Sequence, residues 1–171
     1  DRGMEDSYIL GFEESYGYLT GSYVRDKDAV DGVFAIVEMF AYYKTNNLSL
    51  IEVLDNLYKE YGYFLNKLET YEFEGNSGMK KMIELMNYFR GNVLSIGKFK
   101  ISRVVDYEKG IDDLPPSNVL KFFFSGHSIT IRPSGTEPKL KIYYSIKEEN
   151  EKDALVTYDY LSSLIKTILK K

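Results

Sequence analysis

The chain has 171 residues, 44% of them hydrophobic and 28% charged, a composition typical of one or two globular domains with a buried core. Its formal net charge of −4 argues against a general nucleic-acid or anionic-membrane surface. The absence of cysteine excludes disulfides, thiol catalysis and cysteine metal sites, and it suits a cytoplasmic protein.

The N-terminal segment combines a short apolar run with an acidic loop. Tyr8–Leu10 predicts one buried strand, and Gly11–Leu19 follows it directly. Ligands of α/β sheets bind at the carboxyl ends of strands, where this loop would lie. Glu13, Glu14 and Ser15 could hydrogen-bond the vicinal hydroxyls of a sugar. From the residues alone, a solvated acidic turn remains the alternative.

A charged segment and two helices come next. Arg25 and Lys27 are either ligand contacts or members of a surface loop with internal ion pairs. Asp28 is the expected N-cap of a helix over 29–44. We expect this helix to be packed over much of its circumference, because its apolar stripe is wide. The stripe consists of Val30, Val33, Phe34, Ile36, Val37, Met39, Phe40 and Ala41.

The end of this first part has its own local signals. Ser49 and Glu52 have the spacing of a capping box that opens a second helix, and Gly62 is a plausible stop. Residues 67–73 alternate with a period of two and mix polar with apolar groups on each face, which predicts an edge strand. Because strands are few, residues 1–75 are predicted to form a partial α/β domain.

Residues 76–171 predict a compact α+β domain. The pattern indicates an antiparallel four-stranded sheet covered by helices on one face. The expected elements are a helix over 78–89 capped by Ser77 and stopped by Gly91, strands at 99–107, 119–124, 128–131 and 140–146, and a final helix after Asn150. His127, the one histidine, is expected to be structural or solvated in a hairpin turn, and no metal site is predicted.

The stretch Ile131–Lys139 has the features of a phosphate-binding loop between two strands. Arg132 offers a planar fork of donors that can bind two phosphate oxygens. Backbone N–H groups of 134–136 could form an anion nest, which Gly135 would permit, and Lys139 adds charge on the exit side. The alternative from residue types alone is an ordinary strand-connecting turn.

This stretch, Arg-Pro-Ser-Gly-Thr-Glu-Pro-Lys followed by an alternating strand, resembles the phosphate-binding loop in the last domain of the α-D-phosphohexomutases, the phosphoglucomutase and phosphomannomutase family. Gly11–Leu19 resembles the sugar-binding loop of their third domain, and 110–120 is similar to the bacterial phosphoglucomutase branch. The resemblance implies substrate contacts at Glu13, Glu14, Ser15, Arg25 and Lys27, and phosphate contacts at Arg132, Ser134, Gly135, Thr136 and Lys139.

The resemblance also implies an activity, the interconversion of hexose 1-phosphate and hexose 6-phosphate through a phosphoserine and a bisphosphate intermediate. It implies Mg²⁺ as the metal, glucose bisphosphate as activator, and upstream domains of the same polypeptide as partners. The sequence lacks the family's Thr-Ala-Ser-His-Asn-Pro and Asp-Gly-Asp-x-Asp-Arg stretches, so no catalytic or metal residue is expected in this chain, which should be inactive alone. Phe12–Gly17 resembles the loop of glucose-preferring members. A phosphomannomutase and a stand-alone phosphosugar-binding module remain open.

Overall fold

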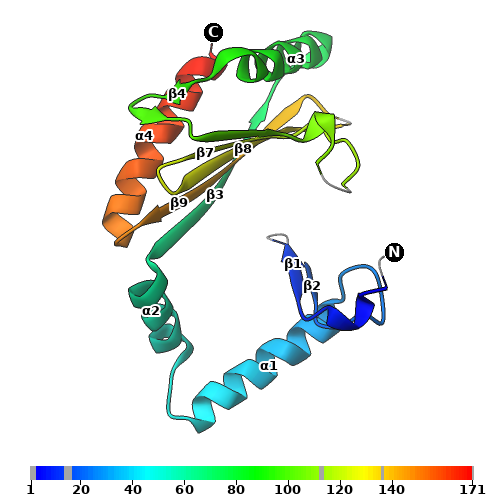
Figure 1. Cartoon of the computed structure of the whole chain (residues 1–171), viewed down its shortest axis with the longest axis vertical. Helices are drawn as coiled ribbons and strands as arrows, with labels where there is room; N and C mark the ends of the chain where they lie inside the picture. Colours follow the sequence, from blue (N-terminus) through cyan, green and yellow to red (C-terminus); the bar gives the residue numbers. More distant parts are fainter. Residues whose placement is uncertain (1–2, 14–16, 112–113, 136, 171) are drawn as a thin grey trace. The chain divides into compact units, whose positions relative to one another are not determined.

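The computed structural model describes residues 3–13, 17–111, 114–135 and 137–170 (Figure 1). The chain divides into two compact units, Asp1–Leu57 and Tyr58–Lys171, and each is described here by itself. Within the described ranges, no helix is long and apolar enough to cross a membrane.

The first unit consists of a small hairpin and helices. Its elements are η1 (Glu5–Ser7), β1 (Gly11–Glu13), β2 (Gly17–Leu19), α1 (Ala29–Thr45) and the start of α2 (Leu50–Tyr61). The predicted cap of α1 is confirmed, because Asp28 Oδ1 accepts hydrogen bonds from the Val30 and Asp31 amides at 2.9 and 3.1 Å. The capping box is also confirmed. The Ser49 amide donates to Glu52 at 2.8 Å, and the Glu52 amide donates to Ser49 Oγ at 3.2 Å.

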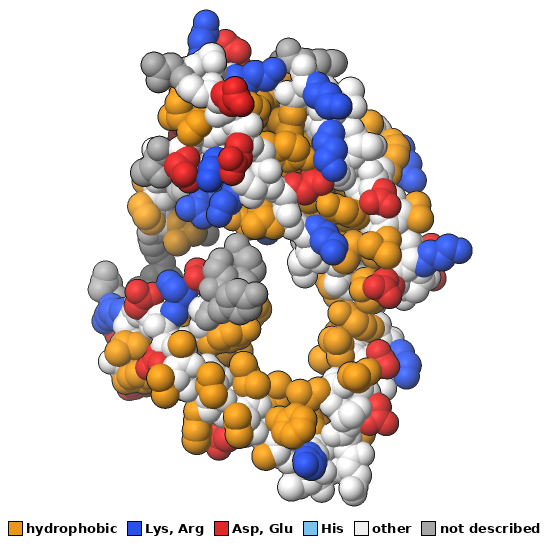
Figure 2. All heavy atoms as spheres, turned by 180° about the vertical axis from the view of Figure 1, so that it is seen from behind, with side chains coloured by type: hydrophobic (Ala, Val, Ile, Leu, Met, Phe, Trp, Pro, Cys, Tyr) orange, Lys and Arg blue, Asp and Glu red, His pale blue; other side chains and the backbone are white. Residues whose placement is uncertain are grey.

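Two predictions for this unit are wrong. Tyr8–Leu10 forms no strand, and Ile9 is 82% exposed, because the described unit contains no sheet beyond the β1–β2 hairpin to pair with it. The apolar stripe of α1 is likewise exposed, with Val33 at 63%, and the one buried residue of the helix is Gly32. Figure 2 shows hydrophobic side chains gathered on the surface of the helices. The stripe predicted the helix correctly but not its surroundings.

The second unit is built on an antiparallel five-stranded sheet of order β3-β9-β8-β7-β6. Its strands are β3 (Tyr63–Glu72), β6 (Arg103–Asp106), β7 (Leu120–Phe124), β8 (His127–Pro133) and β9 (Lys139–Glu148). The prediction of four strands is wrong because it left out β3, which pairs with β9 over its whole length of 10 residues. The predicted edge position of this strand is confirmed.

The position of β3 also moves the division between the two parts of the chain. Sequence patterns predict this division after residue 75, whereas the two compact units divide between Leu57 and Tyr58. The cause is that β3 follows α2 immediately after Gly62, whose φ of +91° ends the helix, and then joins the second unit through β9. The independent folding of the two parts remains a prediction.

Helices α3 (Gly75–Asn92) and α4 (Glu151–Leu169) cover one face of the sheet. The Ser77 cap and the Gly91 stop were wrong. Glu74 precedes the first turn of α3, and the helix continues through Gly91. The Asn150 cap of α4 is confirmed by a 3.0 Å hydrogen bond from the Asp153 amide. The strand expected over 99–107 is divided, because β4 (Ser95–Ile96) and β5 (Phe99–Lys100) form a hairpin of their own.

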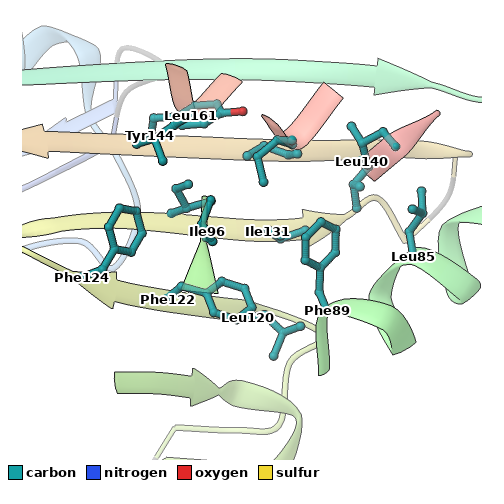
Figure 3. Close-up of a cluster of buried hydrophobic side chains, with 14 of the residues drawn as sticks. Leu85, Phe89, Ile96, Leu120, Phe122, Phe124, Ile131, Leu140, Tyr144 and Leu161 are labelled. Carbon is teal, nitrogen blue, oxygen red and sulfur yellow. The ribbon is translucent and has the colours of Figure 1, made fainter. Parts of the chain in front are cut away.

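The core of the second unit lies between these helices and the inner face of the sheet. Side chains from both helices and the central strands form one buried cluster (Figure 3). Its fully buried members include Phe89, Phe122, Phe124, Ile131, Leu140, Tyr144 and Leu161. The members that come from strands occupy alternate positions, so the residues between them face the other side of the sheet, which these helices leave uncovered.

A carboxylate at the edge of the core ties α4 to β3. Glu69 accepts hydrogen bonds from Tyr71 at 2.6 Å and Tyr144 at 2.9 Å, and it forms an ion pair with Lys166 at 2.9 Å. Tyr158 and Ser162 of α4 donate to its other oxygen at 3.0 and 2.8 Å. Burial alone raises the pKa of Glu69, but these donors together hold it at about 2.

Candidate functional site

The acidic segment of the first unit forms a hairpin beside a pocket. Gly11 to Glu13 pair antiparallel with Gly17 to Leu19. A pocket of about 420 Å³ opens next to this hairpin, a volume suited to a small molecule. The residues that line it are Glu5, Tyr8, Gly11, Phe12, Glu13, Leu19, Gly21, Ser22, Val24, Arg25, Asp26 and Lys27.

Three of the predicted substrate contacts, Glu13, Arg25 and Lys27, share this pocket. Lys27 Nζ lies 3.7 Å from Glu13 Oε1 and 2.9 Å from Asp26 Oδ1. The hydrogen bond with Asp26, aided by the charge of Glu13, raises the pKa of Lys27. The predicted contacts Glu14 and Ser15 lie outside the described residues.

The hairpin allows close approach between the strand and these charged side chains. A side chain at Gly17 would displace the aliphatic part of Lys27 and the Glu13 side chain, so glycine lets both lie against the strand. Arg25 Nη2 lies 3.4 Å from Glu5 Oε1, and its side chain is 75% exposed. The pocket is lined by three carboxylates, Glu5, Glu13 and Asp26, and by two cations, Arg25 and Lys27, all of which can hydrogen-bond the hydroxyl groups of a ligand.

In the second unit, the predicted phosphate loop connects β8 to β9 and is closed by its own backbone. The Ser134 amide donates to the Lys139 carbonyl at 2.7 Å, and the Glu137 amide donates to Ser134 Oγ at 3.4 Å. The Ser134 amide is therefore not directed at an anion in this structure. Gly135 does not adopt a positive φ, and a Cβ there would meet open space. Thr136 lies outside the described residues.

The two basic residues at the ends of this loop differ in their surroundings. Lys139 Nζ forms ion pairs with Glu72 at 3.2 Å and Glu137 at 3.3 Å. The hydrogen bond with Glu72, and next to it the one with Glu137, raises the pKa of Lys139. Arg132 is exposed and makes no ion pair with any described residue. Of the two predicted phosphate-binding cations, Arg132 is therefore the one whose charge no described carboxylate neutralises.

Lys141 is a residue that the sequence analysis missed. It lies directly opposite Arg132 in the register of β8 and β9, on the same face of the sheet, and it too lacks an ion pair among the described residues. Like charges opposite each other destabilise a sheet, so an anion between them would relieve the repulsion. Lys141 could have been found from the sequence, because Arg132 and Lys141 lie at matching distances on either side of the loop. Such positions face each other in a hairpin and point to the same face of the sheet.

His127 lies outside both sites, and of its two predicted roles, structural or solvated, the structure shows the structural one. It is buried, its Nδ1 accepts a hydrogen bond from the Lys147 amide at 3.2 Å, and Phe99 and Phe124 contact its ring edge to face. Burial lowers the pKa of His127, although Glu148, 3.6 Å from Nε2, opposes that shift. Within the described ranges, no group of three or more His, Cys, Asp and Glu side chains is placed to hold a metal ion.

Known proteins are similar to this chain in both of its units. Residues 2–61 match the family model described as phosphoglucomutase/phosphomannomutase, alpha/beta/alpha domain III. The phosphoglucomutase of Staphylococcus saprophyticus is 36% identical over 83% of this chain and 28% of its own length. That of Staphylococcus haemolyticus is 34% identical, with 91% of this chain and 31% of its own length covered. The chain thus spans about three tenths of the length of the curated relatives it matches.

A solved structure shows the same fold. The open form of pp63/parafusin, an exocytosis-sensitive phosphoprotein and phosphoglucomutase from Paramecium, matches with a TM-score of 0.65. The match covers 94% of this chain and 30% of that one at 24% sequence identity. The curated relatives and the family model show that this chain belongs to the phosphoglucomutase/phosphomannomutase family and corresponds to a C-terminal part of such a protein.

Proposed function

We propose that this chain is the sugar- and phosphate-binding portion of a phosphoglucomutase that interconverts hexose 1-phosphate and hexose 6-phosphate. In this scheme a phosphoserine elsewhere in the longer protein gives its phosphoryl group to the sugar phosphate. The resulting bisphosphate then returns a phosphoryl group to the serine. Positioning supplies a large part of phosphoryl-transfer catalysis, and this chain's residues would supply it.

The observation that carries the proposal is the Arg132–Lys141 pair beside the loop. Neither cation forms an ion pair with a described residue, and both lie on one sheet face, while neighbouring Lys139 is already neutralised by Glu72 and Glu137. A phosphate dianion fits between an Arg fork and a Lys ammonium, since it can accept charge-assisted hydrogen bonds from both. We therefore assign the phosphate to Arg132 and Lys141 first, with the Ser134 hydroxyl and the Gly135 and Thr136 amides as further donors.

The pocket beside the hairpin supports the sugar-binding half of the proposal. Glu13 would accept hydrogen bonds from hydroxyls of the hexose, with Glu14 and Ser15 next to it in the sequence. Arg25 and Lys27 line the same pocket and would contact a negatively charged part of the substrate. The resemblance of Phe12–Gly17 to glucose-preferring members favours glucose over mannose phosphates.

Binding of glucose 6-phosphate to the whole chain, followed by calorimetry, tests the phosphate assignment. We expect a millimolar Kd, which corresponds to about 4 kcal/mol, because the other parts of the enzyme are absent. Arg132→Ala should nearly abolish binding, since a lost charge-assisted contact costs roughly 1.5–3 kcal/mol. Lys139→Ala serves as the matched control and should have a smaller effect than Lys141→Ala. Equal affinity of the wild type and Arg132→Ala would contradict the proposal.

An activity assay separates the two alternatives left by the sequence. The chain alone should not convert glucose 1-phosphate or mannose 1-phosphate with Mg²⁺ and glucose bisphosphate present, because it contains no phosphoserine motif. Adding the remaining part of a phosphoglucomutase should restore turnover if the chain is the binding portion of an enzyme. A chain that binds phosphosugar but never supports turnover would instead be a non-catalytic binding module.

A further inference from the structure

The outer edge of β3 carries main-chain groups that no described residue binds. The Phe73 amide donates to the Pro138 carbonyl at 2.8 Å, in register with the pairs of β3 and β9. Hydrogen-bonded pairs alternate along an antiparallel ladder, so the odd-numbered residues of β3 bond to β9 and the even-numbered ones point their N–H and C=O groups away from it. We call the even-numbered ones the free-edge residues, and they are Phe64, Asn66, Leu68, Thr70 and Glu72.

The two edge strands of the sheet differ in length. The strand at the other edge, β6, has 4 residues, whereas β3 has 10. Proteins usually protect a sheet edge by keeping the strand short or by placing a proline or a bulge in it. β3 contains no proline, and its residues pair one to one with β9, so no bulge bends it away from a partner. An edge of this length can accept a further strand.

The sequence of β3 is complementary to itself when it is reversed about Leu68. In an antiparallel pair of two β3 strands centred on Leu68, Asn66 lies opposite Thr70 of the second copy, and every free-edge residue has a partner. An amide and a hydroxyl in such positions can hydrogen-bond each other. Leu68, which is 42% exposed, would meet Leu68 of the second copy on the symmetry axis.

The charges on the helix-covered side of β3 select the same register. Lys67 is exposed and makes no ion pair with a described residue. In the register centred on Leu68 it lies opposite Glu69 of the second copy, where it would add a second cation beside Lys166. A slide of two residues in one direction would place Lys67 opposite Lys67, and a slide in the other direction would place Glu69 opposite Glu69. Like charges directly opposite each other destabilise a sheet, so both slides are disfavoured.

We propose that β3 is the interface of a symmetric dimer, in which two copies of this chain pair along β3 and form one continuous antiparallel sheet. A second copy is favoured over a different partner because the matching charges and the central leucine all come from β3 itself, as a two-fold interface requires. The interface includes neither the pocket of the first unit nor the loop between β8 and β9. The inference is therefore independent of the proposed function.

Sedimentation equilibrium of the whole chain tests for the dimer. We expect twice the chain mass of 19.8 kDa at high concentration and a Kd of about 10 µM, because a single strand pair is a small interface. Leu68→Lys should raise the Kd about tenfold or more, because two lysines would meet on the axis. Lys67→Glu should also weaken the dimer, whereas Lys67→Arg should preserve it. The matched control is Val104→Lys on β6, where the side chain is 48% exposed, and it should leave the Kd unchanged.

Amide hydrogen exchange followed by NMR at about 1 mM chain tests whether the dimer forms through β3. The amides of the free-edge residues should exchange roughly tenfold more slowly in the wild type than in Leu68→Lys, because they are bonded in the dimer alone. The amides of Leu65 and Tyr71 should change much less, because they already bond to β9 in one copy. This alternation along β3 is specific to strand pairing.

Two outcomes would overturn the inference. One is a chain that stays monomeric up to about 1 mM, well above the expected Kd. The other is a dimer that both Leu68→Lys and Lys67→Glu leave intact, since the copies would then associate through another surface. Neither outcome bears on the proposed function, because glucose 6-phosphate binding is measured separately.

Discussion

The two units bury their apolar side chains to different extents. The second unit has a continuous core, with residues such as Phe122 and Ile131 fully buried. In the described part of the first unit, Leu19 is the one buried hydrophobic side chain, while Val33 and Phe34 are each 63% exposed. Burial of apolar surface is the main source of folding free energy. The comparison therefore indicates that most of the chain's stability resides in the second unit.

Truncation tests the difference in stability between the two units with the largest expected effect. A chain of residues 58–171 should stay folded because it keeps β3 and the core, whereas 76–171 should unfold because it loses β3 and the Glu69 hydrogen bonds. Limited proteolysis of the whole chain should accordingly give a stable product that begins near residues 58–62. A stable product that begins at 74–80 would show that the predicted boundary after residue 75 is the correct one.

Substitution of one phenylalanine in each unit sharpens the comparison. Phe122→Ala in the core should lower the free energy of unfolding by about 3–5 kcal/mol, because it leaves a cavity at a site with 0% exposure. Phe34→Ala on α1 should change it by less than about 0.5 kcal/mol, as expected for an exposed site. Urea unfolding followed by circular dichroism measures both. Similar effects of the two substitutions would contradict the difference in burial.

The Glu69 cluster gives the second unit a pH dependence. Its pKa is held at about 2, below the ordinary 4.5, so its contribution is complete above about pH 4.5 and is lost as the pH falls toward 2. Glu69→Gln should cost about 2–3 kcal/mol at pH 7 and much less at pH 2. Exposed Glu84→Gln on α3 is the control and should have little effect at either pH. A Glu69→Gln effect that does not depend on pH would contradict this account.

Local signals were predictable from the sequence, whereas long-range pairing was not. The caps at Asp28, Ser49 and Asn150 involve groups within three residues of each other, so spacing alone identifies them. The partner of β3 lies on β9, far along the chain, and a period of two does not specify which strand pairs with which. The same limit explains the wrong prediction for α1, because its apolar stripe predicts a helix but does not specify which residues pack against it.

In the candidate sites, too, local features were predictable from the sequence and long-range contacts were not. The residue types of the loop identified Arg132, and the symmetric spacing around the loop could have identified Lys141. The neutralisation of Lys139 could not be foreseen in full, because Glu72 comes from β3, a strand assigned to the other part of the chain. Glu13, Arg25 and Lys27 were predicted as substrate contacts on two segments that are adjacent in the sequence. The structure places these three residues around one pocket.

Amide chemical shifts recorded during a phosphate titration of the whole chain test the central claim most directly. In the proposed function, the second unit binds the phosphate group through Arg132 and the loop after it. Shifts should cluster at residues 132–141 and disappear in Arg132→Ala. They should remain in Arg25→Ala, which removes a cation from the pocket of the first unit. Shifts that cluster elsewhere, or that persist unchanged in Arg132→Ala, would contradict the account.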